Sequence, residues 1–446
     1  MKIKQFEDKG LAHYSYAVLS ECAQEIILID PARNPYPYYE YAASHDARIV
    51  GIIETHPHAD FISSHLEIHQ TTGAPIYAHS RVEPDYPFIS FDEGAELNVG
   101  KIRLKSLFTP GHSPDGISIV LEHDGKDKAV FTGDTLFIGD VGRPDLRDDG
   151  KDKRAQKEEL ARQMYHSTRE KLMKLADDVV VYPAHGAGTL CGKGLSDASS
   201  STIGEEKKNN PALQAMAEEE FVEMILEDQP FIPKYFGFNV TLNKQGAPGF
   251  QASIDAVSRL EINHKPRDKA FIIDARSEEN FKKGHLKNAI NIQEGAKFET
   301  WLGSILGPNE SFYLVAESED TLEELIEKSA KIGYEGLILG AFAMEDAGEL
   351  TMSSLDVEDF KSHPENYTIV DIRNGSETAD GLLFDHALAI PLPELRERTD
   401  EIPRNKPVVV HCSGGYRSAA GSSIVAAALP ETKVFDLSEA VKKFES

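Results

Sequence analysis

Four polar residues stand directly after apolar, strand-like runs in the first 190 residues of the chain. The runs are RIVGIIETH, RLKSLFTPGH, KAVFTGD and VVVYPAHG, and the residues concerned are His56, His112, Asp134 and His185. Side chains at strand ends converge on one edge of a sheet, where a metal ion can collect them. Because imidazole and carboxylate groups are metal ligands, the sequence predicts a metal-dependent enzyme.

The loop after the first run carries the most specific pattern. It reads His56-Pro57-His58-Ala59-Asp60-Phe61, an H-x-H-x-D stretch followed by phenylalanine. Together with the later G-H, G-D and A-H elements, this pattern resembles the metallo-β-lactamase superfamily. The resemblance implies an αββα sandwich. The alternative, four satisfied core or surface residues, would require four coincidences at strand ends.

Phe61 is the point where the chain departs from many dinuclear zinc members of that superfamily. Those members carry histidine there, and it helps to hold a second metal, whereas phenylalanine cannot ligate. We therefore expect one ion, held by His56, His112 and Asp134. Two imidazoles and one carboxylate suit non-haem Fe(II) and oxygen chemistry, so one Fe(II) per chain is expected. Zinc hydrolases more often build tetrahedral or paired sites around an activated water.

Four further residues are expected near the metal. His58, Asp60 and His185 are interpreted as orienting the metal ligands or facing the substrate, with a hydrogen-bonded scaffold as the alternative. Arg143, in GDVGRPDL, either attracts an anionic substrate or forms a structural ion pair.

The C-terminal part of the chain contains a repeat. Residues 270–292 resemble residues 367–392, because in both a buried strand ends in Asp-x-Arg and a histidine precedes a second apolar run. A third strand follows in each copy, within 311–320 and 406–417. Strands that alternate with helical stretches indicate parallel βαβ units. The sequence therefore predicts two related α/β domains with parallel sheets.

The third strand of the second copy leads into a loop with a nucleophile. The loop is C-x4-R and consists of Cys412, Ser413, Gly414, Gly415, Tyr416 and Arg417. Inward-turned N–H groups, a helix N-terminus and the arginine can hold an anion and stabilise a thiolate there. The loop resembles the active-site loop of rhodaneses, which implies catalysis by Cys412 and Arg417. The first copy has Ala316 instead, so we expect it to be inactive, a spacer or docking surface.

Two cysteines lie outside this loop. Cys191 stands six residues after His185 in a glycine-rich segment, where it forms a regulatory persulfide, contacts substrate, or is a passive small residue. Cys22, in VLSECAQEI, is interpreted as a packing residue.

Length and composition limit the number of domains and the kinds of partner that the chain can have. A chain of 446 residues suggests several domains. We expect a metallo-β-lactamase-like non-haem iron dioxygenase domain at 1–242, an inactive rhodanese domain at 250–348 and an active one at 354–446. With 47 basic and 74 acidic residues the net charge is −27, which argues against nucleic-acid partners and anionic membranes. Three scattered cysteines, no apolar signal core and no membrane-length run predict a cytoplasmic protein.

Nearly the full length resembles the multidomain persulfide dioxygenase–rhodanese fusions. The resemblance implies that a low-molecular-weight thiol persulfide and O2 react at Fe(II) to give sulfite and thiol. It also implies that Cys412 passes sulfane sulfur to sulfite, giving thiosulfate, and that the chain self-associates as a homo-oligomer. Three alternatives stay open: a dinuclear zinc thioester hydrolase of the glyoxalase II kind, a sulfurtransferase whose metal domain only binds or stores persulfide, and a sulfur-sensing adaptor. The thiol carrier is also open.

Overall fold

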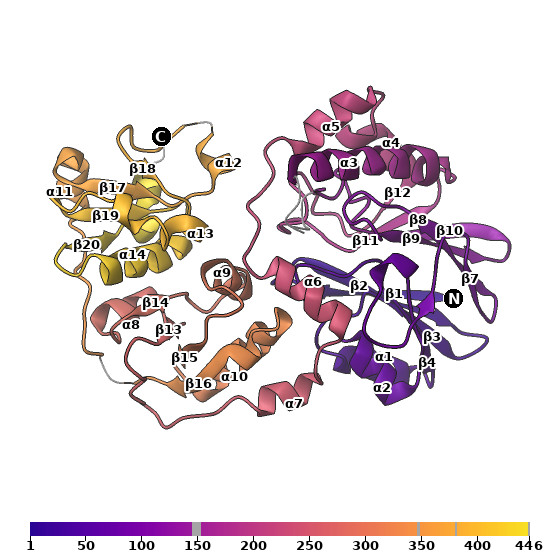
Figure 1. The fold of residues 1–446 in the computed structure, drawn as a ribbon, viewed down its shortest axis with the longest axis horizontal. Coiled ribbons are helices and arrows are strands. Elements are labelled where there is room, and N and C mark those ends of the chain that lie inside the picture. The colour runs from indigo at the N-terminus through magenta and orange to yellow at the C-terminus, as the bar shows by residue number, and fades with distance from the viewer. Residues whose placement is uncertain (145–152, 346–347, 380, 445–446) are drawn as a thin grey trace. The chain divides into compact units, whose positions relative to one another are not determined.

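The computed structural model describes residues 1–144, 153–345, 348–379 and 381–444 (Figure 1). The chain forms two compact units. The first consists of Met1–Ala252 with Lys331–Gly333, and the second of Ser253–Ala330 with Tyr334–Ser446. Among the described residues, no helix is both long and apolar enough to span a membrane.

The first unit contains two six-stranded sheets. The first sheet has the order β1-β2-β3-β4-β5-β6, with bounds Lys2–Asp8, His13–Ser20, Glu25–Ile29, Arg48–Ile53, Ile76–Ala78 and Ile89–Ser90. The second has the order β12-β11-β10-β9-β8-β7. In chain order its strands are Glu96–Val99, Ile102–Phe108, Ile117–His123, Lys126–Gly133, Val180–Pro183 and Ser201–Thr202.

Helices cover the outer face of each sheet. Their bounds are α1 Tyr36–Ser44, α2 His65–Thr72, α3 Lys153–His166, α4 Ile203–Asn209, α5 Glu218–Leu226 and α6 Phe236–Gln245. In Figure 1, α1 and α2 lie beside β3 and β4, and α3 to α5 lie against the other sheet. This is the predicted αββα sandwich.

Strand β3 shows why the sandwich forms from these residues. Its sequence, EIILI, is apolar at successive positions, so both faces of the strand must be covered. Ile26 and Leu28 pack with Tyr38 and Ile68 under the helices. Ile27 packs in a separate core between the two sheets.

The second unit contains two four-stranded parallel sheets, as the repeat predicts. The first has the order β14-β13-β15-β16, with β13 Phe271–Asp274, β14 Ala289–Asn291, β15 Phe312–Ala316 and β16 Ile338–Ala343. The second has the order β18-β17-β19-β20, with β17 Thr368–Asp371, β18 Leu388–Ala389, β19 Val408–His411 and β20 Val434–Asp436. All neighbouring strands in both sheets run parallel.

The helices of this unit connect the parallel strands. They are α8 Glu278–Lys283, α9 Phe298–Ile305, α10 Glu319–Lys331, α11 Val357–Ser362, α12 Gly375–Thr378, α13 Leu392–Leu395 and α14 Tyr416–Ala428. Helix α7, Phe250–Asp255, leads from the first unit into the second.

The Asp-x-Arg signature has the same local structure in both repeats. Arg276 pairs with Asp274 at 2.7 Å, and Arg373 pairs with Asp371 at 2.6 Å, at the ends of β13 and β17. The third strands lead into different residues, since β15 ends at Ala316 and β19 continues into Cys412.

Candidate active sites

The three predicted metal ligands lie together in the first unit. His56 follows β4, His112 follows β8 and Asp134 follows β10, as the apolar runs indicated. Each offers one ligand atom to a buried group, here called the first triad, whose ligand atoms all lie within 4.8 Å of one another. The Nε2 atoms of His56 and His112 are 3.9 Å and 3.4 Å from Asp134 Oδ2.

Hydrogen bonds on the far side of each ring orient the two imidazoles. His112 donates from Nδ1 to the carbonyl of Arg143 at 2.8 Å. His56 donates from Nδ1 to the hydroxyl of Thr55 at 3.1 Å, and that hydroxyl donates to Asp30 at 2.8 Å. Such bonds fix the tautomer with the proton on Nδ1, so that Nε2 of each ring faces Asp134 with its lone pair.

The surroundings of the Asp134 carboxylate show whether the first triad can hold a cation. This carboxylate is buried, and neither oxygen has a hydrogen-bond partner within the described structure. A buried carboxylate without hydrogen bonds is costly unless a positive charge compensates it. Two neutral imidazoles and one such carboxylate are a donor set that a divalent first-row metal satisfies.

A second buried group, the second triad, consists of His58, Asp60 and His185. His185 Nε2 lies 3.4 Å from Asp60 Oδ2 and 3.5 Å from Asp134 Oδ1. His185 donates from Nδ1 to the carbonyl of Ala12 at 3.3 Å, which directs Nε2 toward both carboxylates. Burial raises the pKa of Asp60 above its usual value.

His58 faces a different set of neighbours. Its Nε2 is 3.1 Å from Asp30 and 3.6 Å from Glu54, both of them buried carboxylates. Although burial favours the neutral ring, Asp30 and Glu54 outweigh it and raise the pKa of His58 to about 9. The imidazole lies between two carboxylates, which favour its protonated form.

Phe61 fills the space beside the second triad. It is buried, and its ring centroid lies 3.8 Å from that of His13 and 4.3 Å from that of His58. Phe61 thus packs against both imidazoles and adds no ligand to the site.

Sequence reasoning missed three residues of this region, namely Asp30, Glu54 and His13. Asp30 follows the apolar run EIILI of β3, which is the same strand-end signal that identified the four original residues. It adopts a left-handed backbone conformation with φ 49°, which is strained for a residue other than glycine. Glu54 directly follows β4, and His13 begins β2.

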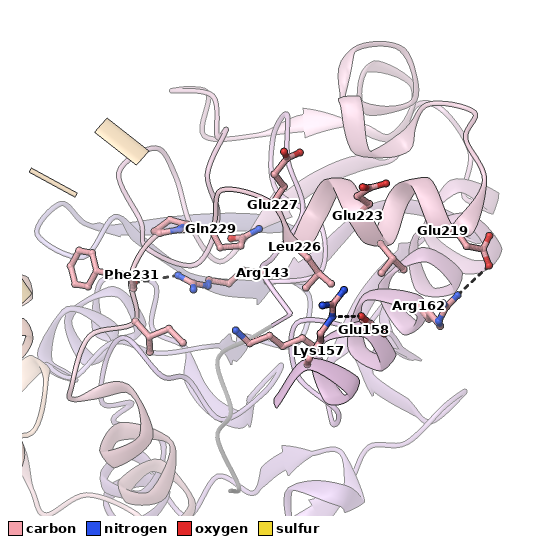
Figure 2. Close-up of a pocket in the computed structure, with 14 residues that line it drawn as sticks. Arg143, Lys157, Glu158, Arg162, Glu219, Glu223, Leu226, Glu227, Gln229 and Phe231 are labelled. Atoms are coloured by element: carbon pink, nitrogen blue, oxygen red, sulfur yellow. Dashed lines mark hydrogen bonds and ion pairs between the residues drawn. The ribbon is translucent and has the colours of Figure 1, made fainter. Parts of the chain in front are cut away.

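Arg143 acts on the site through its backbone as well as its side chain. The carbonyl accepts from His112, and the buried guanidinium donates to the carbonyls of Leu190 at 3.2 Å and Phe231 at 3.3 Å. Figure 2 shows the guanidinium in the wall of a cavity of about 930 Å³. Two other cations of that wall are paired, Arg154 with Glu158 and Arg162 with Glu218, each at 2.9 Å.

The two cysteines of the first unit differ in exposure. Cys191 is buried and can form a ligand group with Asp134 and His185. Burial raises the pKa of the Cys191 thiol well above its usual value, and the neighbouring carboxylates raise it further. Cys22 is exposed, so the interpretation of Cys22 as a packing residue is wrong. It occupies a turn between β2 and β3, where no core covers it.

In the second unit, the C-x4-R loop connects β19 to α14. Cys412 is buried, and the N–H of Gly415 donates to its Sγ at 3.1 Å. Gly415 has φ 98°, and a Cβ there would lie 2.8 Å from the backbone nitrogen of Glu439, so only glycine fits. Ser413, Gly414 and Tyr416 complete the loop.

Arg417 is held by groups of its own repeat. Its guanidinium donates to both carboxylate oxygens of Glu377, at 2.6 Å and 2.7 Å, and to the hydroxyl of Ser413 at 2.7 Å. Although burial favours a neutral carboxyl, Arg417 holds the pKa of Glu377 below its usual value. The guanidinium plane is thus fixed beside the thiol loop.

The first repeat has no such loop. Ala316 is buried at the end of β15, and Glu317 follows it. Glu317 accepts hydrogen bonds from the N–H of Ser277 and from Asn280, both at 3.0 Å. A carboxylate and its donors therefore follow the strand where the second repeat has a thiol and glycines.

Comparison with known proteins agrees with this architecture. Residues 10–185 match the metallo-beta-lactamase superfamily, and residues 259–339 and 356–446 match the rhodanese-like domain. A solved metallo-beta-lactamase from Staphylococcus aureus subsp. aureus COL is 30% identical, with a TM-score of 0.70, and the match covers 77% of this chain and 99% of that one. The chain belongs to the metallo-beta-lactamase superfamily. It is a fusion in which rhodanese-like repeats follow the metallo-beta-lactamase domain.

Relatives of named activity match the metallo-beta-lactamase half. The human mitochondrial persulfide dioxygenase ETHE1 is 27% identical over 224 residues, which is 50% of this chain and 80% of the relative. A hydroxyacylglutathione hydrolase of Francisella tularensis subsp. novicida is 28% identical over 187 residues, 42% of this chain and 68% of the relative. These relatives are thus named for an oxidative activity and for a hydrolytic activity.

Proposed function

We propose that the chain oxidises a low-molecular-weight thiol persulfide with O2 at one Fe(II) and transfers sulfane sulfur through Cys412. The first triad would hold the iron through His56, His112 and Asp134. One combined observation carries this proposal. The first triad is a complete set of three ligands, while Phe61, which lies beside the second triad, supplies no ligand there. The persulfide dioxygenase among the relatives supports it.

The oxidation balances with one O2 and one water. A persulfide RSSH, O2 and H2O give RSH, sulfite and two protons, and the terminal sulfur loses the four electrons that O2 gains. Bound Fe(II) would supply open coordination positions for a sulfur anion and dioxygen together.

Residues of the second triad have a role in preparing the substrate. His185 accepts the persulfide proton at Nε2, because its Nδ1 proton is engaged by the carbonyl of Ala12. Asp60, 3.4 Å away, stabilises the resulting imidazolium. Phe61 and the buried rings beside it exclude water from this side of the site.

The rhodanese step uses the loop of the second repeat. The Cys412 thiolate attacks the outer sulfur of RSSH, the S–S bond breaks, and RSH leaves with the proton. Sulfite then attacks the outer sulfur of the Cys412 persulfide, and the electron pair of that S–S bond returns to Sγ, releasing thiosulfate. The inward N–H of Gly415 stabilises negative charge on Sγ in both steps. Sulfite from the first site is the acceptor at the second, and tethering raises its encounter rate.

The test is oxygen uptake by anaerobically purified, iron-loaded protein after addition of glutathione persulfide or coenzyme A persulfide. We expect one O2 to be taken up per persulfide that ends as sulfite, and one O2 per two persulfides where the sulfite is converted to thiosulfate. Cys412→Ser is expected to keep oxygen uptake and to lose thiosulfate, which separates the two halves. Absence of persulfide-dependent oxygen uptake in iron-loaded protein would refute the dioxygenase. Thiosulfate formation by Cys412→Ser would refute the assigned nucleophile.

The second candidate is a dinuclear zinc thioester hydrolase fused to a sulfurtransferase. The buried second triad and the hydroxyacylglutathione hydrolase among the relatives favour it. Two zinc ions per chain and hydrolysis of a glutathione thioester would establish it.

A further inference from the structure

The inactive repeat contacts the thiol loop of the active repeat directly at two places within the second unit, and it supports a third place through Ser438. Helix α14, which the loop begins, packs against β14, and α9 packs against α13. A repeat without a nucleophile therefore forms part of the surroundings of Cys412. The two direct contacts involve the loop's tyrosine and arginine, and the indirect one involves its glycine.

The first contact holds Tyr416. Its hydroxyl donates to the backbone carbonyl of Gln293, in the inactive repeat, at 2.6 Å. Gly295 of the same segment lies so close that a Cβ there would be 3.3 Å from the Tyr416 ring. Nearby, the N–H of Asn291 donates to the hydroxyl of Ser423 on α14 at 3.0 Å. The start of α14 is thus fixed to the segment after β14.

The second contact lies against the loop's arginine. The guanidinium carbon of Arg417 lies 5.7 Å from the ring centroid of Trp301, on α9 of the inactive repeat. This distance is within the range of a cation–π interaction. Glu377 and Ser413 engage the guanidinium's edge, so the indole adds a constraint from another repeat.

The third contact is indirect and supports the turn at Gly415. That glycine is closely packed against the backbone of Ser438 and Glu439. Ser438 donates its hydroxyl to Glu278 of the inactive repeat, and Lys282 beside it pairs with Asp436 at 2.8 Å. Both sides of the loop are therefore braced by the same repeat.

We propose that the inactive repeat is a support for the persulfide loop, with Trp301 and the Gln293 carbonyl as positioning groups that hold Arg417 and Tyr416 in the anion-binding arrangement. This inference rests on the proposed sulfur transfer at Cys412. A loop held in advance loses less conformational freedom when the anion binds, which lowers the KM for an anionic sulfur donor.

The experiment uses the full chain with thiosulfate as the anionic sulfur donor and cyanide as the acceptor. Trp301→Leu removes the aromatic ring, and Trp301→Phe keeps one. We expect Trp301→Leu to raise the KM for thiosulfate about two- to fivefold with a smaller change in kcat, and Trp301→Phe to restore most of the difference. Tyr416→Phe, which removes a single hydrogen bond, is expected to lower kcat/KM about two- to tenfold.

Two matched controls exist in the same unit. Phe271→Leu removes another inter-repeat cation–π contact, in which Arg396 lies 4.5 Å from the ring. Tyr367→Phe removes a tyrosine hydroxyl that donates to Asp359 at 2.8 Å within the active repeat. Neither contact involves the loop, so neither control is expected to change the KM for thiosulfate.

Trp301 also gives a spectroscopic readout, because it is the single tryptophan of the chain. We expect its emission to change when thiosulfate loads sulfur onto Cys412, and to stay constant in Cys412→Ser. The inference is overturned if the Trp301 and Tyr416 variants match their controls and the emission does not respond to loading. If wild-type protein transfers no sulfur at all, the proposed function itself fails.

Discussion

The first and second triads contain similar residues, two histidines and an aspartate each, but their neighbours differ. In the first triad the far sides of both rings are bonded to neutral oxygens, of Thr55 and the Arg143 backbone. In the second, His58 faces two carboxylates, while Phe61 lies against its ring. A neutral acceptor leaves an imidazole free to offer a lone pair to a metal, whereas carboxylates hold it as a cation. Residue type alone therefore does not define a metal ligand.

The strongest test of this comparison removes a ring from the first triad. His112→Ala is expected to lower iron content per chain at least tenfold and to abolish persulfide-dependent oxygen uptake, because one of three ligands is lost. Iron analysis and an oxygen electrode measure both. His69→Ala, a histidine on α2 whose ring bonds the Ala74 carbonyl, is the matched control and should behave as wild type. Full iron content in His112→Ala would contradict the assignment of this ligand.

The second test concerns the charge of His58 in metal-free protein. The pKa of His58 is raised to about 9 in the folded state, from about 6.5 in the unfolded chain. The protonated imidazole therefore stabilises the folded state fully below pH 6.5, and this stabilisation is lost as the pH rises through 9. From pH 6.5 to 9.5 we expect the free energy of unfolding to fall by roughly 3 kcal/mol more than in His58→Gln. Denaturant unfolding of chelator-treated protein measures it. Equal pH dependence in both proteins would show that His58 is neutral.

The third test weakens the support of His56 without touching a ligand. Thr55→Val removes the hydroxyl between His56 and Asp30. We expect iron affinity to fall about ten- to a hundredfold, as for other residues that orient metal ligands. Competition with a chelator measures the affinity. Thr72→Val, whose hydroxyl bonds a helix carbonyl, is the control.

The smallest effect is expected for Asp60→Asn. If the second triad holds no ion, this change leaves the metal content per chain at one. Oxygen uptake falls about tenfold or less, because only the partner of His185 is altered. Metal analysis decides the point, since a drop from two ions to one would show that Asp60 is a ligand.

Much of this organisation was predictable because it depends on local sequence. Apolar runs closed by a polar residue indicated the strand ends of the first triad, and the repeated Asp-x-Arg strands indicated the parallel sheets. Asp30 carries the same signal but lies outside the H-x-H-x-D loop, so it was overlooked.

Other contacts cannot be predicted from a single sequence. The carbonyl of Arg143 orients His112, and any residue type supplies a carbonyl. The position of Trp301 against Arg417 depends on how two repeats pack, which composition does not specify. Exposure of Cys22 likewise results from its turn and not from its apolar neighbours.

We propose that the first unit holds a single ion for oxygen chemistry. Anaerobic titration of metal-free protein with Fe(II), followed by persulfide-dependent oxygen uptake at each addition, tests it most directly. We expect activity to rise linearly and to stop rising at one iron per chain. A break at two metals per chain, or a zinc-loaded pair that cleaves thioesters while iron-loaded protein consumes no oxygen, would contradict it.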